Sequence, residues 1–363
     1  MLIRFPLYFK VVVLLLGIFL FFYCLNIAKH IVVIFSLAGL ISILLLPLNM
    51  RLERLKIPRM ASIIICLVLM TLLLALLGFF IYSQMLHFIG DFDLIIQRLT
   101  DLIHRSADFF ADNFGTDRQK HEQWIKESVS SPLKRGSSVF TAALSFTTST
   151  VSILGLLPVF IFFMLYYRDF YKEFLLKLFH NGSHSQVQQM VDKIEVVVQN
   201  YLLGVLIVTT IISVMNIIGL SLLGVKYAFF FGILAGILNI IPYVGVFIGS
   251  SLPILYTYIT GGSLWQTLGV VIVMWAIQFT EGHFITPNIV GSRVSLNPFA
   301  AIIALIIGGQ LWGPVGMVLF IPYTAVLKVI CDSVEPLQPY GFLLGNPGKT
   351  QKLKKDKSLN PIL

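Results

Sequence analysis

Charged side chains are scarce in this chain. Asp, Glu, Lys and Arg make up 12% of its 363 residues, about half the roughly 25% of a soluble globular domain. Hydrophobic residues make up 57%, and the mean hydropathy is +0.89. This composition excludes intrinsic disorder and nucleic-acid binding as the main activity, and it indicates a polytopic protein embedded in a lipid bilayer.

Cysteine is also scarce. Cys24, Cys66 and Cys331 lie in or beside apolar runs, and their spacing suggests neither a disulfide framework nor a metal site. We interpret them as small apolar fillers. A disulfide-stapled secreted fold is therefore excluded, and we expect no metal and no cofactor.

Acidic residues are fewer than basic ones, 17 against 26, which gives a net charge of +9. Lys and Arg collect in the cytoplasmic loops of membrane proteins. The basic residues of this chain cluster at 51–59, at 168–177 and in a lysine-rich tail at 349–357. These clusters predict that both termini are cytoplasmic.

Long apolar runs predict an all-α protein with about five to six full transmembrane helices. The runs cover residues 8–28, 31–48, 60–83, 139–167, 201–223 and 264–284. The first run has no small-x-small cleavage site after it, and a second run follows at once. We therefore interpret the first run as a retained helix and not as a signal peptide.

Two further segments mix polar and apolar residues at helical spacing. In 84–136, apolar positions such as Phe88, Phe92 and Ile95 share the segment with charged residues on the other face. A half-polar helix does not span lipid, so we predict an amphipathic extracytoplasmic insert. A second apolar stripe, which predicts a cytoplasmic amphipathic helix, consists of Val187, Met190, Ile194, Val197 and Tyr201.

The last third contains two long apolar segments that glycine and proline interrupt. Residues 228–260 are broken around Pro242, and residues 298–331 are broken around Gly313. Non-helical backbone is tolerated at membrane depth only where protein or a watery cavity surrounds it, and paired broken segments are typical of transporter binding sites. We predict two re-entrant helical hairpins whose tips meet near mid-membrane; the alternative is a pair of long kinked spans. Close packing is favoured in either case by three GxxxG spacings: Gly232/Gly236, Gly245/Gly249 and Gly309/Gly313.

Few residues in this region carry chemistry. Glu281 is the only acidic residue between Glu195 and Asp332. A carboxylate near a span is costly unless it pairs, faces a cavity or takes up a proton. Glu281 therefore either binds a coupling ion beside Gln278 or has a structural role at the interface. Asn239 either donates its amide to a solute or caps backbone groups freed by the break. The expected hinge and turn residues are Pro287, Gly291, Pro298 and Pro322.

Enzymatic motifs are incomplete. His121-Glu122 begins like the zinc-protease helix motif, but Ile125 stands where the second histidine is required. The sequence has no P-loop, so it does not encode ATP hydrolysis, and no pair of aspartates occupies facing spans. We therefore do not expect an enzyme.

The motifs of the last third occur together in one order. The series runs Gly236-Ile-Leu-Asn239-Ile-Ile-Pro242-Tyr243-Val-Gly245, Thr286-Pro287-Asn-Ile-Val-Gly291, Leu296-Asn-Pro298 and Gly308-Gly309-Gln-Leu-Trp-Gly313-Pro-Val-Gly316, with Pro322 after it. It resembles the AI-2E transporter family, also called the PerM-type permeases. The chain length, the order of the spans and the insert after the third span also fit this family.

The resemblance implies a bacterial inner-membrane permease that assembles as a homo-oligomer and moves a small solute without an ATPase. The family's namesake activity is export of the quorum-sensing signal autoinducer-2, and other members are associated with sodium/proton antiport. The positions that match the family pattern are Asn239, Pro242, Gly245, Glu281, Pro287, Gly291, Pro298, Gly309, Gly313 and Gly316. We expect the substrate or ion pathway at Asn239, Pro242, Tyr243, Gly245, Gln278, Glu281, Gly309, Gly313 and Gly316.

Three hypotheses follow: secondary export of a small polar solute such as autoinducer-2, cation/proton antiport through Glu281, and a non-transporting scaffold whose insert binds an envelope partner. Antiporters usually bury carboxylates at mid-membrane, whereas this chain offers one near an interface, so export ranks first.

The expected organisation is three transmembrane helices in 1–83, the insert in 84–136, a fourth helix in 137–168, the cytoplasmic amphipathic helix in 169–200, a transport core with two hairpins in 201–336 and the basic cytoplasmic tail in 337–363.

Overall fold

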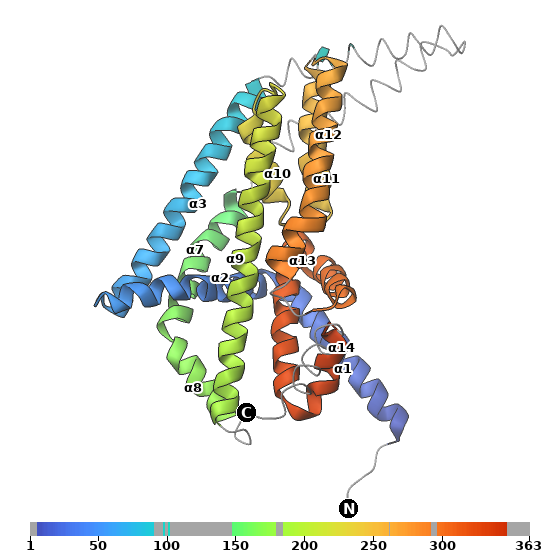
Figure 1. The fold of residues 1–363 in the computed structure, drawn as a ribbon. Coiled ribbons are helices and arrows are strands. Elements are labelled where there is room, and N and C mark those ends of the chain that lie inside the picture. The colour runs from blue at the N-terminus through green and yellow to red at the C-terminus, as the bar shows by residue number, and fades with distance from the viewer. Residues whose placement is uncertain are drawn as a thin grey trace, which may run out of the picture. The chain divides into compact units, whose positions relative to one another are not determined.

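The computed structural model describes residues 6–90, 97–98, 101, 147–178, 184–260, 262–291 and 296–346. This part of the chain is almost entirely helical, and its β-structure amounts to an isolated bridge between Leu296 and Gly345 (Figure 1). The prediction of an all-α protein is confirmed. Most of the predicted insert, the segment 292–295 and the lysine tail lie outside the described residues.

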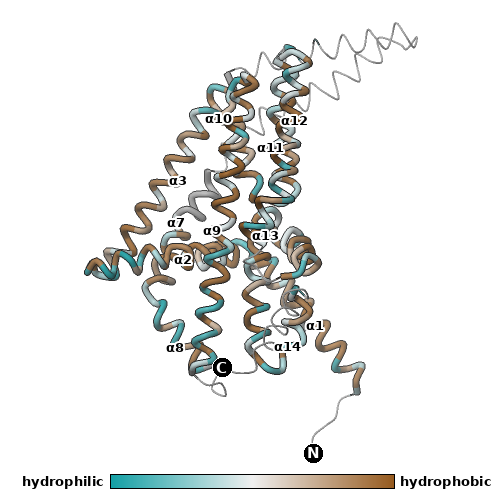
Figure 2. The backbone as a smooth tube through the Cα atoms, viewed as in Figure 1, coloured by the Kyte–Doolittle hydropathy of each residue, from teal (hydrophilic) through white to brown (hydrophobic). Residues whose placement is uncertain are grey.

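Among the described residues, six helices are long and apolar enough to cross a membrane; five correspond to predicted spans, and the sixth is the second broken segment. They are Leu7–Ile27, Lys29–Arg54, Arg59–Phe88, Ser185–Leu222, Leu264–Gly291 and Pro298–Ser333. Figure 2 shows α3 brown along its length, whereas α8 carries hydrophilic residues. The predicted span at 139–167 corresponds to α7 (Thr147–Tyr166), and its first eight positions are outside the described part.

Several helices are longer than the apolar runs that predicted them. α1 (Leu7–Ile27) follows its run closely, but α2 (Lys29–Arg54) continues into the basic loop, where Arg51 and Arg54 occupy its last turn. Cations stabilise the carboxyl end of a helix because they complement its dipole. α3 (Arg59–Gly90) continues past the apolar run, so the first residues assigned to the insert belong to this helix.

The chain forms two compact units, each built from separate stretches of sequence. Unit 1 comprises residues 1–67, 156–207 and 286–363, and unit 2 comprises 68–155 and 208–285. The long helix α9 (His184–Leu222) contributes its first part to unit 1 and its last part to unit 2. The predicted amphipathic stripe and the span that follows it are therefore one continuous helix.

The core of unit 1 forms where α9 meets α2 and α13 (Pro298–Ser333). Val198 of α9 packs with Leu40 and Leu319, and Tyr201 packs with Ala325. The predicted stripe on α9 is the face that is buried here, since Val187, Met190 and Tyr201 are all at most 6% exposed. The apolar stripe of this segment therefore packs inside unit 1, and its cytoplasmic location stays a prediction.

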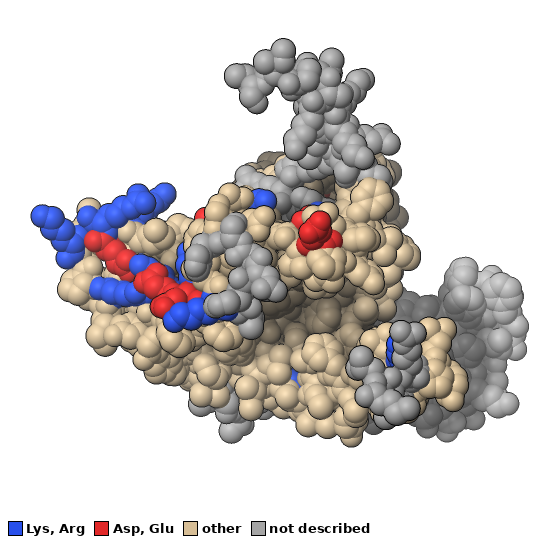
Figure 3. All heavy atoms as spheres, turned by 90° about the horizontal axis from the view of Figure 1, so that it is seen from below, with Lys and Arg blue, Asp and Glu red and all other residues tan. Residues whose placement is uncertain are grey.

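Ion pairs connect the helices of unit 1. α8 (Arg168–Leu178) begins with an arginine whose guanidinium binds both carboxylate oxygens of Glu53, and the Asn49 amide donates to the same carboxylate over 2.9 Å. The shortest N···O distances are 2.6 Å for Arg168–Glu53, 2.6 Å for Arg59–Asp169 and 2.9 Å for Lys172–Glu195. Figure 3 shows acidic and basic side chains next to one another at one edge of the face that it views.

The second broken segment of the sequence lies in unit 1 and folds back on itself. Gly313 interrupts α13 with φ 64° and ψ −146°. Gly308 and Gly316 then meet backbone to backbone, and the Trp312 and Phe320 rings lie 5.2 Å apart. Residues eight apart in a straight helix are separated by about 12 Å. The segment is therefore two helical arms joined by a turn; its re-entry into a membrane stays a prediction.

The first broken segment forms a helical hairpin in unit 2. α10 (Ala228–Leu238) has 11 residues and α11 (Val244–Ile259) has 16, which gives lengths of about 16 and 24 Å. Neither arm can cross a hydrocarbon core of roughly 30 Å by itself. The predicted hairpin shape of residues 228–260 is present, and its re-entrant placement stays a prediction.

Glycines allow the helices of unit 2 to approach closely. Gly245 of α11 faces the Leu238 carbonyl oxygen, and a Cβ on Gly249 would lie 3.0 Å from Cα of Ala235. On the other side of α10, Gly232 and Gly236 lie against α9. The packing role predicted for these two GxxxG pairs is confirmed. Gly313 of the third pair differs, because no atom lies within 4 Å of a Cβ added there.

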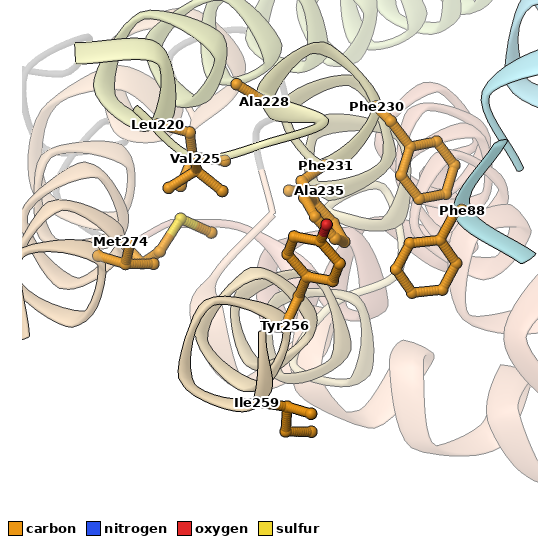
Figure 4. Packing of buried hydrophobic residues seen from close by; sticks show 11 residues of the cluster. Phe88, Leu220, Val225, Ala228, Phe230, Phe231, Ala235, Tyr256, Ile259 and Met274 are labelled. Carbon is orange, nitrogen blue, oxygen red and sulfur yellow. The ribbon is translucent and has the colours of Figure 1, made fainter. Parts of the chain in front are cut away.

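An aromatic cluster fills the core of unit 2. Phe88 at the end of α3 packs against Phe230, Phe231 and Tyr256, with ring centroids 5.6–5.9 Å apart. Figure 4 shows Leu220 and Met274 on the other side of the same cluster. Offset and edge-to-face rings at these separations contribute about 0.5–1.5 kcal/mol per pair beyond the burial of their area. The hairpin is thus held by α3, α9 and α12 (Leu264–Thr280).

Alanine at position 245 tests the closure of this hairpin. A methyl group there would overlap the Leu238 carbonyl oxygen, so α10 and α11 would have to separate. We expect Gly245→Ala to lower the free energy of unfolding by about 1–3 kcal/mol or more, seen as a lower melting temperature of the detergent-purified protein. Gly78→Ala in α3 is the control, because a Cβ there meets nothing within 4 Å. Equal melting temperatures for the two variants would contradict the close contact.

Candidate functional site

The tip of the α10–α11 hairpin is a strained turn. The Val244 N–H donates to the Pro242 carbonyl oxygen over 2.7 Å, and Tyr243 between them has φ 62° and ψ −56°. These values define the rare, strained form of the γ-turn. The Tyr243 side chain is 72% exposed, so burial of the ring does not account for the strain. Strained residues concentrate at functional sites, which makes this tip a candidate.

Asn239 lies where α10 ends. Its own N–H donates to the Ala235 carbonyl oxygen, and the N–H groups of Ile240 and Ile241 also bond to carbonyls of the last turn. Its half-buried side chain has no hydrogen bond within the part of the chain that the structure describes. Backbone groups at the break are therefore satisfied by the turn itself, and the amide does not act as their cap.

The turn of α13 depends on its glycines in two different ways. Gly308 and Gly316 are in backbone contact, and a Cβ on Gly309 would lie 2.8 Å from the Met317 methyl group. Gly313 instead supplies a conformation, φ 64° and ψ −146°, that is essentially restricted to glycine. The indole N–H of Trp312 donates to the Leu25 carbonyl oxygen over 3.3 Å and so attaches this turn to α1.

Glu281 stands where α12 changes its winding. The chain continues from α12 as two π-helical turns, η2 (Glu281–Ile285) and η3 (Pro287–Gly291). The Gln278 side-chain amide donates to Oε2 of Glu281 over 2.7 Å, and both residues are half-buried. The two residues expected to lie together are thus in contact. Local π-helical winding is frequent at functional sites.

Three of the four expected hinge and turn residues lie at the ends of elements. Pro287 and Gly291 bound η3, and Pro298 opens α13 behind Asn297, whose side chain accepts a hydrogen bond from the Ala300 N–H. Pro322 differs, because it is fully buried inside the second arm of α13. A turn at Pro322 is therefore not observed, and hinge motion at the other three stays a prediction.

The two broken segments belong to different units: the α10–α11 hairpin to unit 2 and the turn of α13 to unit 1. Asn239, Pro242, Tyr243, Gly245, Gln278 and Glu281 lie in unit 2, and Gly309, Gly313 and Gly316 lie in unit 1. The meeting of the two tips stays a prediction.

A cavity of about 300 Å³ occurs in unit 1 among α2, α7, α8 and α9. Most of its lining is apolar, including Phe35, Ile43 and Met164, with Arg168 and Lys172 among the polar exceptions. The expected pathway residues do not line it. Apolar walls leave the hydrogen-bonding groups of a polar solute unpaired, so this cavity is not the candidate site.

The ion pairs of unit 1 have no signature in the amino-acid sequence. From the sequence, Arg59, Arg168 and Lys172 belong to clusters that indicate cytoplasmic loops; in the structure each also has a carboxylate partner. The Arg168–Glu53 partners are separated by 115 residues, so no local spacing reveals them.

These observations define a polytopic helical membrane protein in which two apolar segments are broken by glycine-dependent turns. The chain belongs to the AI-2E transporter family: the AI-2E family transporter profile matches residues 9–335. The resemblance found in the sequence is confirmed. The protein is a membrane transporter of a bacterial transporter family.

Individual relatives match over most of their length. YrrI of Bacillus subtilis, named as a candidate transport protein, is 29% identical over 304 residues, which are 80% of this chain and 82% of YrrI. The AI-2 transport protein TqsA of Escherichia coli is 25% identical over 350 residues, which are 93% of this chain and 96% of TqsA. A candidate transport protein of Haemophilus influenzae is 26% identical over 328 residues, which are 88% of this chain and 92% of that protein.

Glycine at position 243 tests the strain at the hairpin tip. A positive φ costs an L-residue about 1–2 kcal/mol, and glycine does not incur this cost. We expect Tyr243→Gly to leave the melting temperature unchanged or to raise it. Leu255→Gly is the control, because Leu255 is also exposed but lies in the interior of α11, where glycine lowers stability by about 1 kcal/mol. Equal destabilisation by both variants would contradict the strained turn.

Proposed function

We propose that this transporter exports a small polar solute such as autoinducer-2 across the bacterial inner membrane, without ATP hydrolysis. The observation that carries the proposal is the alignment with TqsA, named as an AI-2 transport protein, over 93% of this chain. An alignment of this extent includes both broken segments, so it supports a shared mode of transport and not only a shared membrane anchor.

The distribution of charge supports a neutral solute. Between residues 201 and 331 the sequence contains a single acidic residue, Glu281, and few basic ones. A charged solute inside a membrane requires compensating charges, because desolvation of an ion is costly. A neutral solute requires only hydrogen-bonding groups, which Asn239 and Gln278 offer.

The pathway proposed from the sequence consists of Asn239, Pro242, Tyr243, Gly245, Gln278, Glu281, Gly309, Gly313 and Gly316. In this proposal the polar members contact the solute, while the glycines and Pro242 form the two turns between which it passes. We also propose that both termini are cytoplasmic, that the protein is a homo-oligomer and that it has no catalytic activity.

Cation/proton antiport through Glu281 is the second candidate. One observation favours it: Glu281 is half-buried beside Gln278 at the start of a π-helical turn. Only one carboxylate is available in this region, however; it follows the last residue of α12, inside the candidate span Leu264–Gly291. We therefore rank antiport below export of a neutral solute.

Transport into liposomes separates the two candidates. We expect the purified wild-type protein to move autoinducer-2 across vesicles that contain no ATP, and we expect Glu281→Gln to retain this movement because the solute is neutral. A pH-sensitive dye inside the same vesicles reports sodium-driven proton movement. Sodium-dependent proton flux that Glu281→Gln abolishes, together with no movement of autoinducer-2, would refute export and establish antiport.

Labelling at position 293 tests the two-hairpin topology. If both broken segments are re-entrant hairpins, Arg293 lies on the cytoplasmic side; if each segment crosses once, it lies outside. We expect Arg293→Cys in intact cells to resist a membrane-impermeant maleimide and to react after permeabilisation. The exposed Cys24 is first replaced by serine, whereas Cys66 and Cys331 are buried. Labelling from outside in intact cells would exclude the hairpins.

A further inference from the structure

Asn216 is buried in α9 without a full set of partners. Its side chain is 2% exposed, its amide donates to the Ile212 carbonyl oxygen over 2.9 Å, and its Oδ1 has no hydrogen-bond partner among the described residues. The amide bonds only within its own helix, so it does not hold two helices together. An unpaired buried acceptor costs about 1–3 kcal/mol, and an apolar side chain would pack here at lower free energy.

The glycines of α10 define how this helix lies against α9. Gly232 contacts Ile217, and Gly236 contacts Ser213. Residue numbers rise along one helix as they fall along the other, so α9 and α10 run antiparallel. Asn239 comes one turn after Gly236. Because the two helices are antiparallel, Asn239 lies about one turn from Ser213 toward the start of α9.

α12 lies antiparallel to α9 as well. The register is defined by two contacts, Gly219 with Val273 and Gly269 with Leu223, and by the Gln266 amide, which donates to the Leu223 carbonyl oxygen over 2.8 Å. The hydrogen-bonded pair Gln278–Glu281 lies up to about two turns beyond Val273 along α12, which places it at the level of Ser213 on α9. All of these residues belong to unit 2.

Polar side chains from three helices therefore gather at one level of unit 2. The half-buried members are Thr209 and Ser213 of α9, Asn239 of α10 and Gln278 and Glu281 of α12. Asn216 lies one turn further along α9 and is fully buried. One turn beyond it, Leu220 packs with Met274 in the apolar cluster (Figure 4). Along α9 the polar side chains therefore run from the half-buried Thr209 and Ser213 to the buried Oδ1 of Asn216. The apolar cluster around Leu220 follows directly after Asn216.

We propose that Thr209, Ser213 and Asn216, which we call the α9 polar column, bind the transported solute together with Asn239 and Gln278. The class of solute that fits is small, neutral and rich in hydroxyl groups, and Oδ1 of Asn216 accepts a hydrogen bond from its deepest hydroxyl. This inference rests on the proposed export function and deepens it, because it assigns the substrate class to the chemistry of α9. A site that hydrogen-bonds a hydroxyl discriminates against an analogue that lacks it, because the buried acceptor is then left unpaired.

Leucine at position 216 tests the column. Asn216→Leu removes the amide and keeps a side chain of similar length. We expect the KM for autoinducer-2 in proteoliposomes to rise about 3–10-fold, the loss that corresponds to one neutral hydrogen bond. The melting temperature of the variant should not fall, because the unpaired acceptor is removed. A thermal-shift titration with D-ribose, a neutral polyhydroxylated probe, supplies a binding readout that does not depend on transport.

Asn49→Leu is the matched control. Asn49 is 0% exposed, and its Oδ1 also lacks a partner among the described residues, but it lies in unit 1 beside Glu53. We expect this variant to keep the wild-type KM and the wild-type response to D-ribose, whatever its stability.

The outcomes separate this inference from the export function. Wild-type transport with an unchanged KM and an unchanged D-ribose response in Asn216→Leu overturns the column and leaves export intact. Absence of autoinducer-2 transport with a D-ribose shift that Asn216→Leu abolishes supports the column and overturns autoinducer-2 as solute. Absence of both transport and a shift in the wild-type protein overturns both.

Discussion

The constraint on which this structure depends is that lipid offers no hydrogen-bond partner to the backbone. Wherever an apolar helix is interrupted, its free N–H and C=O groups must be satisfied within the protein. At Pro242 the γ-turn does this locally by pairing the Val244 N–H with the Pro242 carbonyl oxygen. At Gly313 the chain reverses instead, and the arms close until Gly308 touches Gly316. In both places glycine allows the approach, because a side chain would separate the arms and expose the break.

The positions of these breaks could be predicted from the sequence because glycine and proline interrupt otherwise continuous apolar runs. The buried face of α9 at Val187, Met190 and Tyr201 could also be predicted, since its apolar residues recur at helical spacing; the fully buried Val198 was not in the predicted stripe. Helix ends were less predictable. α3 continues to Gly90 although its apolar run is shorter, because polar residues beyond the run do not end a helix when no proline or capping residue intervenes.

Features that depend on distant partners could not be predicted. The Arg168–Glu53 pair joins residues 115 positions apart, and isolated charges in a sequence do not reveal their partner. The sequence predicts a break around Gly313, but its GxxxG spacing also suggests close packing, which the structure does not show at this glycine. Asn216 gave no signal, because one asparagine in an apolar run is compatible with exposure, capping or burial. Its burial and its unpaired oxygen emerge only when α9, α10 and α12 are packed together.

Scarcity of charge and the presence of neutral amides have the same physical origin. Inside a low-dielectric protein, a charged solute and the charged side chain that binds it must both be desolvated, which is costly. A charged solute that is bound tightly enough to offset this cost is released slowly. A hydrogen bond between neutral groups contributes about 0.5–1.5 kcal/mol, so two or three of them select a solute and still permit its release. In the proposed site, Asn216, Asn239 and Gln278 supply this chemistry, and Glu281 lies beside Gln278 at the end of α12. A carrier for a neutral solute needs few charged residues in its core, so the low charge of this chain is consistent with the proposed solute as well as with a place in the membrane.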